Sequence, residues 1–149
     1  MIELLSAIAT TASLILFTIS LSRLFSARLA AATILCSIAF IYVGFSLKVN
    51  PVNSIILEVL VATVFYLIAV IGYSKNNSIL AYGIILHGVW DILHHKASLI
   101  KTDIPHYWPL YCLMCDLLLG VYFLLVFRRQ SNAKIEISKS SQPKSAFDI

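Results

Sequence analysis

Histidines and a carboxylate with the spacing of metal ligands lie between residues 87 and 95 of this chain. On an α-helix His87, Asp91 and His94 share one face within about 60° of arc, and His95 widens that arc to about 100°. Two imidazoles and a carboxylate form a ligand set for zinc or for ferrous iron. The sequence therefore predicts a zinc or iron site with His87, Asp91, His94 and His95 as ligands.

Two more carboxylates, Glu58 and Asp116, lie inside other apolar stretches. A charged group within a bilayer is costly and usually faces the interior of a helix bundle, so both are expected beside the histidines. We predict them as catalytic residues, with Asp116 as a further ligand and Glu58 as a general base for water. Asp91-x-x-His94 also has the spacing of bundle di-iron sites, but a complete site needs a second such pair.

The elements that position these groups are membrane helices. The 149 residues are 60% hydrophobic and only 12% charged, with a mean hydropathy of +0.91, which is too apolar for a soluble domain. Apolar runs of about 20 residues match the hydrocarbon thickness of a bilayer. We predict an all-α, polytopic membrane bundle over residues 1–129, followed by a polar, flexible cytoplasmic tail over 130–149. The five expected transmembrane helices are 3–22, 28–47, 54–73, 78–95 and 109–127.

The basic residues predict the orientation of these helices. With five crossings, eight Lys and Arg residues lie on one side and three on the other. The positive-inside rule then places the amino terminus outside and the carboxyl tail in the cytoplasm of a cell-membrane protein. If 78–95 is only re-entrant, the division is six against five and indicates no orientation. The net charge of +4 reflects this loop bias, so no nucleic-acid partner is expected.

Alternating crossings also predict a common depth for the polar groups. Counted from the outer helix ends at about 1.5 Å per residue, Glu58, His87, Asp91 and Asp116 lie roughly 6 to 12 Å below one surface. Three helices thus supply polar groups to one leaflet, which favours a single site.

Cys112-x-x-Cys115 raises a thiol redox alternative. It resembles the vitamin K epoxide reductase arrangement in this feature alone, because those enzymes relay electrons through further cysteines in an external loop. The remaining cysteine here, Cys36, lies in the middle of an expected helix. We therefore predict that the pair has no redox function.

The stretches 86–96 and 109–117 resemble a small family of uncharacterised multi-pass bacterial membrane proteins with a Trp-Asp and paired-histidine motif, which implies no known activity. Residues 91–95 also resemble the end of the His-x-x-His-His box of membrane desaturases, with Asp91 at the first histidine. Those enzymes use more histidines than the four present here. Membrane zinc hydrolases of the ceramidase and adiponectin-receptor type compare in chemistry only.

Three functions stay open at this point. The first is metal-dependent chemistry on a lipid-soluble or amphipathic substrate within the lipid bilayer. The second is a small proton- or ion-coupled transporter or channel, in which the same groups titrate and a homo-oligomer is expected. The third is a structural membrane subunit without chemistry.

Overall fold

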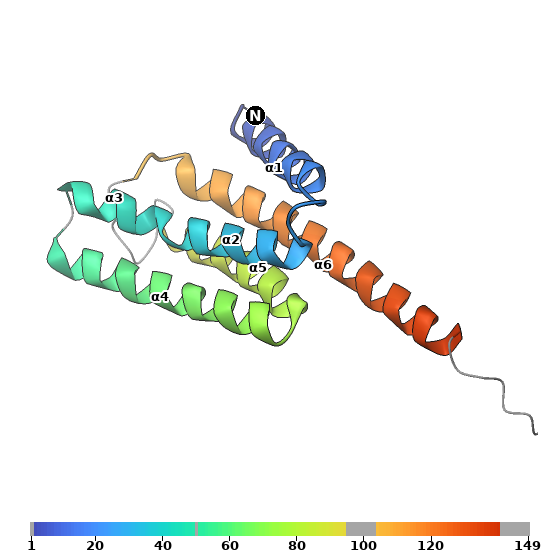
Figure 1. The fold of residues 1–149 in the computed structure, drawn as a ribbon. Helices are drawn as coiled ribbons and strands as arrows, with labels where there is room; N and C mark the ends of the chain where they lie inside the picture. The colour runs from blue at the N-terminus through green and yellow to red at the C-terminus, as the bar shows by residue number, and fades with distance from the viewer. Residues whose placement is uncertain (1, 50, 95–103, 141–149) are drawn as a thin grey trace, which may run out of the picture.

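The computed structural model describes residues 2–49, 51–94 and 104–140, and all the regular structure in these ranges is α-helical (Figure 1). The predicted all-α class is therefore confirmed. The helices in chain order are α1 (Ile2–Ser20), α2 (Ala27–Ala39), α3 (Ile41–Val49), α4 (Val52–Ser74), α5 (Asn77–Ile92) and α6 (Trp108–Ser140).

Four segments of the described chain are long and apolar enough to cross a membrane. They are Ile2–Ser20, Ala27–Lys48, Val52–Ser74 and Trp108–Ser140, so α2 and α3 together form one segment. The remaining helix, α5, has 16 residues and is about 24 Å long, against about 30 Å for a hydrocarbon core. The helices are those of a membrane protein, and the crossing of α5 as a fifth span stays a prediction.

Helix α5 lies at the centre of the bundle, packed against α2, α4 and α6. Helix α1 packs on α6 (Figure 1). At this contact the Tyr111 hydroxyl donates to Thr10 Oγ1 at 2.7 Å. Small side chains line much of the core, as is usual where membrane helices approach closely. The buried cluster comprises Ala31, Ala32, Leu35, Ala39, Ala62, Phe65, Ala69, Leu80, Ala81, Ile84, Leu119, Phe123 and Phe127.

The close approach of α5 and α6 depends on glycine. A Cβ added at Gly120 would lie 2.4 Å from Ile85 Cγ1 and 3.1 Å from the Ala81 carbonyl oxygen. At Gly88 it would lie 3.2 Å from Asp116 Cβ. The absence of these side chains lets α6 bring Asp116 against α5.

The break between α2 and α3 lies at Phe40, whose backbone has φ −92° and ψ −1°. Neither proline nor glycine stands at this point of the chain. The backbone carbonyl of Ile38, just before the break, lies beside the ring of His87 of α5. The break in the helix is therefore next to His87.

Two expected helix ends differ from the structure. Helix α5 ends at Ile92 rather than at residue 95, so His94 lies in a turn beyond the helix, with its N–H bonded to the Asp91 carbonyl. Helix α6 continues to Ser140, so the first part of the predicted tail is helical, and the flexibility and cytoplasmic location of the tail stay predictions. After Arg129 the sequence Gln130–Ser140 contains neither Gly nor Pro, so nothing in it ends a helix.

Candidate metal centre

The first pair in the buried polar cluster is His87 of α5 with Asp116 of α6. His87 Nδ1 lies 2.7 Å from Asp116 Oδ2, and each residue is only 2% exposed. The Ile38 carbonyl, at the α2–α3 break, also lies beside this ring. Nδ1 of His87 is thus directed at carboxylate oxygens.

Asp91, one turn along α5 from His87, is fully buried. The Tyr42 hydroxyl of α3 donates to its Oδ1 at 2.7 Å, and His87 Nδ1 lies 3.9 Å from the same oxygen. Asp91 Oδ2 has no hydrogen-bond partner within the described part of the chain. A buried carboxylate oxygen left in this way costs free energy unless a cation or a proton completes its surroundings.

His87, Asp91 and Asp116 form a buried group that could hold a metal ion. Each offers one ligand atom, and these three atoms all lie within 4.8 Å of one another. Metal–ligand bonds of about 2.0 to 2.2 Å need ligand atoms less than about 4.4 Å apart, so small side-chain rotations would be enough. A divalent cation would also balance the two negative charges of ionised Asp91 and Asp116.

The second pair is His94 with Glu58 of α4. His94 Nε2 lies 2.7 Å from Glu58 Oε1, and Nδ1 lies 3.2 Å from the Trp90 carbonyl oxygen. A carbonyl only accepts hydrogen bonds, so Nδ1 carries a hydrogen and donates it. Nε2 and Glu58 then share one proton between them, since two lone pairs would repel at this distance.

Tyr42 connects the two pairs. Its ring stacks on the His94 ring with centroids 4.1 Å apart, while its hydroxyl holds Asp91. Sequence reasoning missed this residue. The available signal was a tyrosine within an apolar span, because a phenolic hydroxyl buried in a bilayer needs a hydrogen-bond partner.

The predicted site residues divide into two groups. The structure brings His87, Asp91 and Asp116 together as possible ligands, and it pairs His94 with Glu58 next to them. The predicted ligand His95 lies outside the described residues. As expected, the three carboxylates face the bundle interior from three helices rather than lipid.

The cysteine pair lies outside these groups. Cys112 and Cys115 are buried free thiols on α6, and Cys115 Sγ faces the Ala7 carbonyl of α1 at 3.7 Å. The pair therefore contributes to the packing of α1 on α6. The absence of a redox function stays a prediction.

Comparison with known proteins adds a family and no activity. No curated protein and no solved structure matches this chain. One family match covers residues 2–129, which includes every helix that contributes to the polar cluster. The match does not test the histidine motif or the bacterial origin that the sequence resemblance implies, so both stay predictions. The extent of the match shows that the chain belongs to DUF6010, a family of unknown function.

Proposed function

We propose that this membrane protein binds a divalent transition metal through His87, Asp91 and Asp116 and uses it for chemistry on a lipid-soluble or amphipathic substrate. The observation that carries the proposal is Asp91 Oδ2, a fully buried carboxylate oxygen without a partner among the described residues, beside a second carboxylate and an imidazole. His87 is the one basic side chain that pairs with these carboxylates in the described chain, and a bound divalent metal would supply the counter-charge for both.

The donor set favours zinc or ferrous iron. One imidazole and two carboxylates suit both ions, and the Ile38 carbonyl beside the His87 ring would orient it as a supporting contact commonly does for a metal-bound histidine. His94 would become a ligand only by leaving Glu58. We therefore assign it a role beside the metal rather than on it.

The chain's own residues supply the proton handling. A bound divalent metal would polarise a substrate carbonyl or phosphoryl group and acidify a water molecule. Glu58 and His94 share one proton at 2.7 Å, so this pair places a proton donor and a proton acceptor beside the metal site. Tyr42 orients Asp91 through its hydroxyl and holds the His94 ring by stacking.

A proton-relay function is the second candidate, favoured by the continuous series of buried groups from Asp116 through His87, Asp91, Tyr42 and His94 to Glu58. The series occupies one end of the bundle. Towards the other end, the described core around Leu80, Ile84 and Phe127 is apolar. A proton crossing the membrane through one copy of this bundle would meet that apolar core, so we favour the metal site.

We propose the cell membrane as the location, with the polar cluster in the outer half. The described basic residues support this orientation. Arg28 and Lys75 lie at the ends of α2 and α4 that are remote from the cluster, and Arg128 and Arg129 lie on α6 directly after buried Phe127, while Lys48 lies at the near end of α3.

Elemental analysis tests the proposal. Wild-type protein is purified in detergent with neither a chelator nor a metal-affinity tag, and zinc, iron and manganese are measured per chain. We expect stoichiometric metal in the wild type and its loss in H87A, D91A and D116A. H94A should lose less, since supporting contacts typically change metal affinity by about 10 to 100-fold.

The matched control is H106A, which removes an exposed histidine. It should keep the wild-type metal content. Folded wild-type protein that contains no metal, and binds none when titrated with Zn²⁺ or Fe²⁺, would overturn the metal proposal and favour the relay or structural functions.

A further inference from the structure

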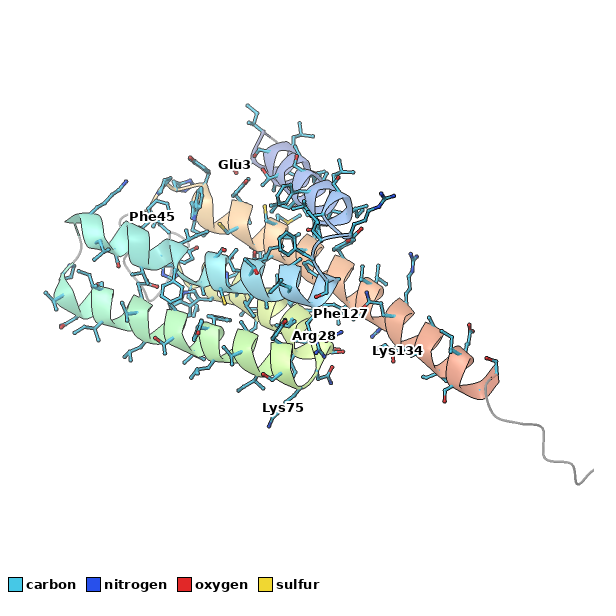
Figure 2. All side chains as sticks on the ribbon, in the orientation of Figure 1. Glu3, Arg28, Phe45, Lys75, Phe127 and Lys134 are labelled. Atoms are coloured by element: carbon cyan, nitrogen blue, oxygen red, sulfur yellow. The ribbon has the colours of Figure 1, made fainter. Side chains whose placement is uncertain are left out.

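A second polar site lies at the opposite end of the bundle, where α2 begins, α4 turns into α5, and α6 passes. A cleft of about 240 Å³ opens there. Figure 2 shows Arg28, Lys75, Phe127 and Lys134 together at this end, with Phe45 at the other. We define this basic cleft by its lining residues, which are Arg28, Lys75, Asn76, Asn77, Ser78, Phe127, Gln130, Ser131 and Lys134.

The basic cleft is built for an anion. Arg28, Lys75 and Lys134 come from three different helices or their ends, and none of the described lining residues is acidic. Side-chain amides and hydroxyls supply most of the remaining lining, which gives further donors for an oxyanion. The positive-inside rule accounts for basic residues on one side of a membrane, but it does not account for three helices contributing basic residues to the lining of one cleft.

Arg28 is held in place before any ligand binds. Its Nε donates a hydrogen bond to Asn77 Oδ1, and its guanidinium carbon lies 5.9 Å from the centroid of the Tyr73 ring. These contacts fix the planar group while its terminal N–H groups can still bind two oxygens of a phosphate. A fixed guanidinium loses less conformational entropy on binding than a mobile lysine.

The amino terminus of α5 adds a favourable dipole. Asn76 caps this helix by accepting from Ser78 N–H, and Asn76, Asn77 and Ser78 all line the cleft. The start of a 16-residue helix carries partial positive charge and amide N–H groups that favour phosphate. Here the dipole acts together with the three cations.

The position of the basic cleft along the membrane normal indicates the source of the phosphate. Buried Phe127 belongs to the apolar core, and the adjacent Arg128 and Arg129 are exposed, so the cleft lies where the apolar core gives way to the membrane surface. Basic pockets between membrane helices on the cytoplasmic side characteristically bind anionic lipid headgroups. We propose that the basic cleft binds a phosphate group, supplied by the headgroup of an anionic phospholipid.

The test compares lipid and soluble phosphate on the full-length protein. In the lipid arm, protein in detergent is titrated with phosphatidylglycerol or with phosphatidylcholine, and bound lipid is counted by native mass spectrometry. In the soluble arm, inorganic phosphate and glycerol 3-phosphate are titrated, and thermal unfolding is followed. Preferential binding of phosphatidylglycerol identifies the lipid source. A response to soluble phosphate with no preference between the lipids identifies a soluble source for the same cleft chemistry.

Variants then locate the binding. R28Q and K134Q should each weaken binding of the phosphate ligand by about fivefold, from about 1 kcal/mol per basic residue at a membrane surface. R129Q and K139Q are matched controls, because they remove the same charge from α6 outside the cleft. K134Q changes an exposed residue beyond the bundle core, so it should fold even if R28Q does not.

Two results would overturn the proposal. One is an equal loss of binding in K134Q and in R129Q, which would mean a general surface charge effect. The other is the absence of any response to phosphatidylglycerol, inorganic phosphate and glycerol 3-phosphate by folded wild-type protein. Neither result bears on the metal centre, which lies at the other end of the bundle.

Discussion

His87 Nδ1 and Asp116 Oδ2 lie 2.7 Å apart and join α5 to α6. The pair lies beside Gly88, one of the glycines at which these two helices approach each other closely. Both side chains are buried, so the hydrogen bond between them is the main interaction that compensates each for its loss of hydration. The pair therefore supports the bundle even when no metal is bound, and that dependence can be measured separately from metal content.

We predict strong coupling between His87 and Asp116 in metal-free protein. Each of H87A and D116N should lower the free energy of unfolding by about 1 to 3 kcal/mol, because the remaining partner stays buried with less compensation. The double variant should lose less than the sum of the two, with a coupling of about 0.5 to 3 kcal/mol. Chemical or thermal unfolding in detergent with chelator present gives these values.

The control for that cycle combines H87A with E136Q, a change at an exposed residue in the projecting end of α6. These two effects should add within about 0.5 kcal/mol. Additive behaviour of H87A and D116N as well would contradict a direct interaction between the two side chains.

Tyr42→Phe tests the residue that links the two histidine pairs. The change removes the hydroxyl that donates to Asp91 Oδ1 and leaves that carboxylate with His87, at 3.9 Å, and the second carboxylate, Asp116, as its polar neighbours. We expect a loss of about 1 to 3 kcal/mol in unfolding free energy and a fall in metal affinity of about 10 to 100-fold. Tyr82→Phe, at a tyrosine that is 56% exposed, should change stability by less than about 0.5 kcal/mol. Equal effects of the two changes would argue against the Tyr42 bond.

Gly120→Val tests the close packing of α5 on α6. The new side chain would overlap Ile85 and the Ala81 carbonyl, so we expect a destabilisation of about 1 to 3 kcal/mol and displacement of Asp116 from its partners. Gly44→Ala is the matched control, because nothing lies within 4 Å of the added Cβ. It should be neutral or stabilising by up to about 1 kcal/mol, since alanine favours helix more than glycine does. If Gly120→Val left both stability and metal content unchanged, α5 and α6 would not pack as described.

Reporter fusions test the orientation of the helices. Fusions at Lys75 and after Ser140 should report the cytoplasm, and those at Lys48 and Lys101 should report the outside, because the basic residues divide eight to three across five crossings. The critical comparison is Lys75 with Lys101, on the two sides of α5. Finding both on one side would mean that this 16-residue helix does not cross, and it would remove the argument for a common depth.

The sequence by itself determined the class of the protein and the inward direction of its charged groups. Long apolar runs can satisfy their backbone only as helices in a bilayer, and Glu58, Asp91 and Asp116 cannot face lipid without a large cost. Both conclusions need composition and spacing alone. The three carboxylates were expected at one end of the bundle because successive helices were expected to run in alternating directions.

The tertiary structure decided which groups meet. The pairing of His87 with Asp116 depends on the rotation of α5 against α6 and on the space left at Gly88, which helical periodicity within one segment does not specify. His94 left the predicted face because α5 ends at Ile92, and this end let it reach Glu58 instead. Tyr42 reaches the cluster from the first turn of α3, directly after the break at Phe40 that separates α3 from α2. Each outcome rests on contacts between residues far apart in the chain, and the energies of such contacts depend on three-dimensional packing that no local pattern encodes.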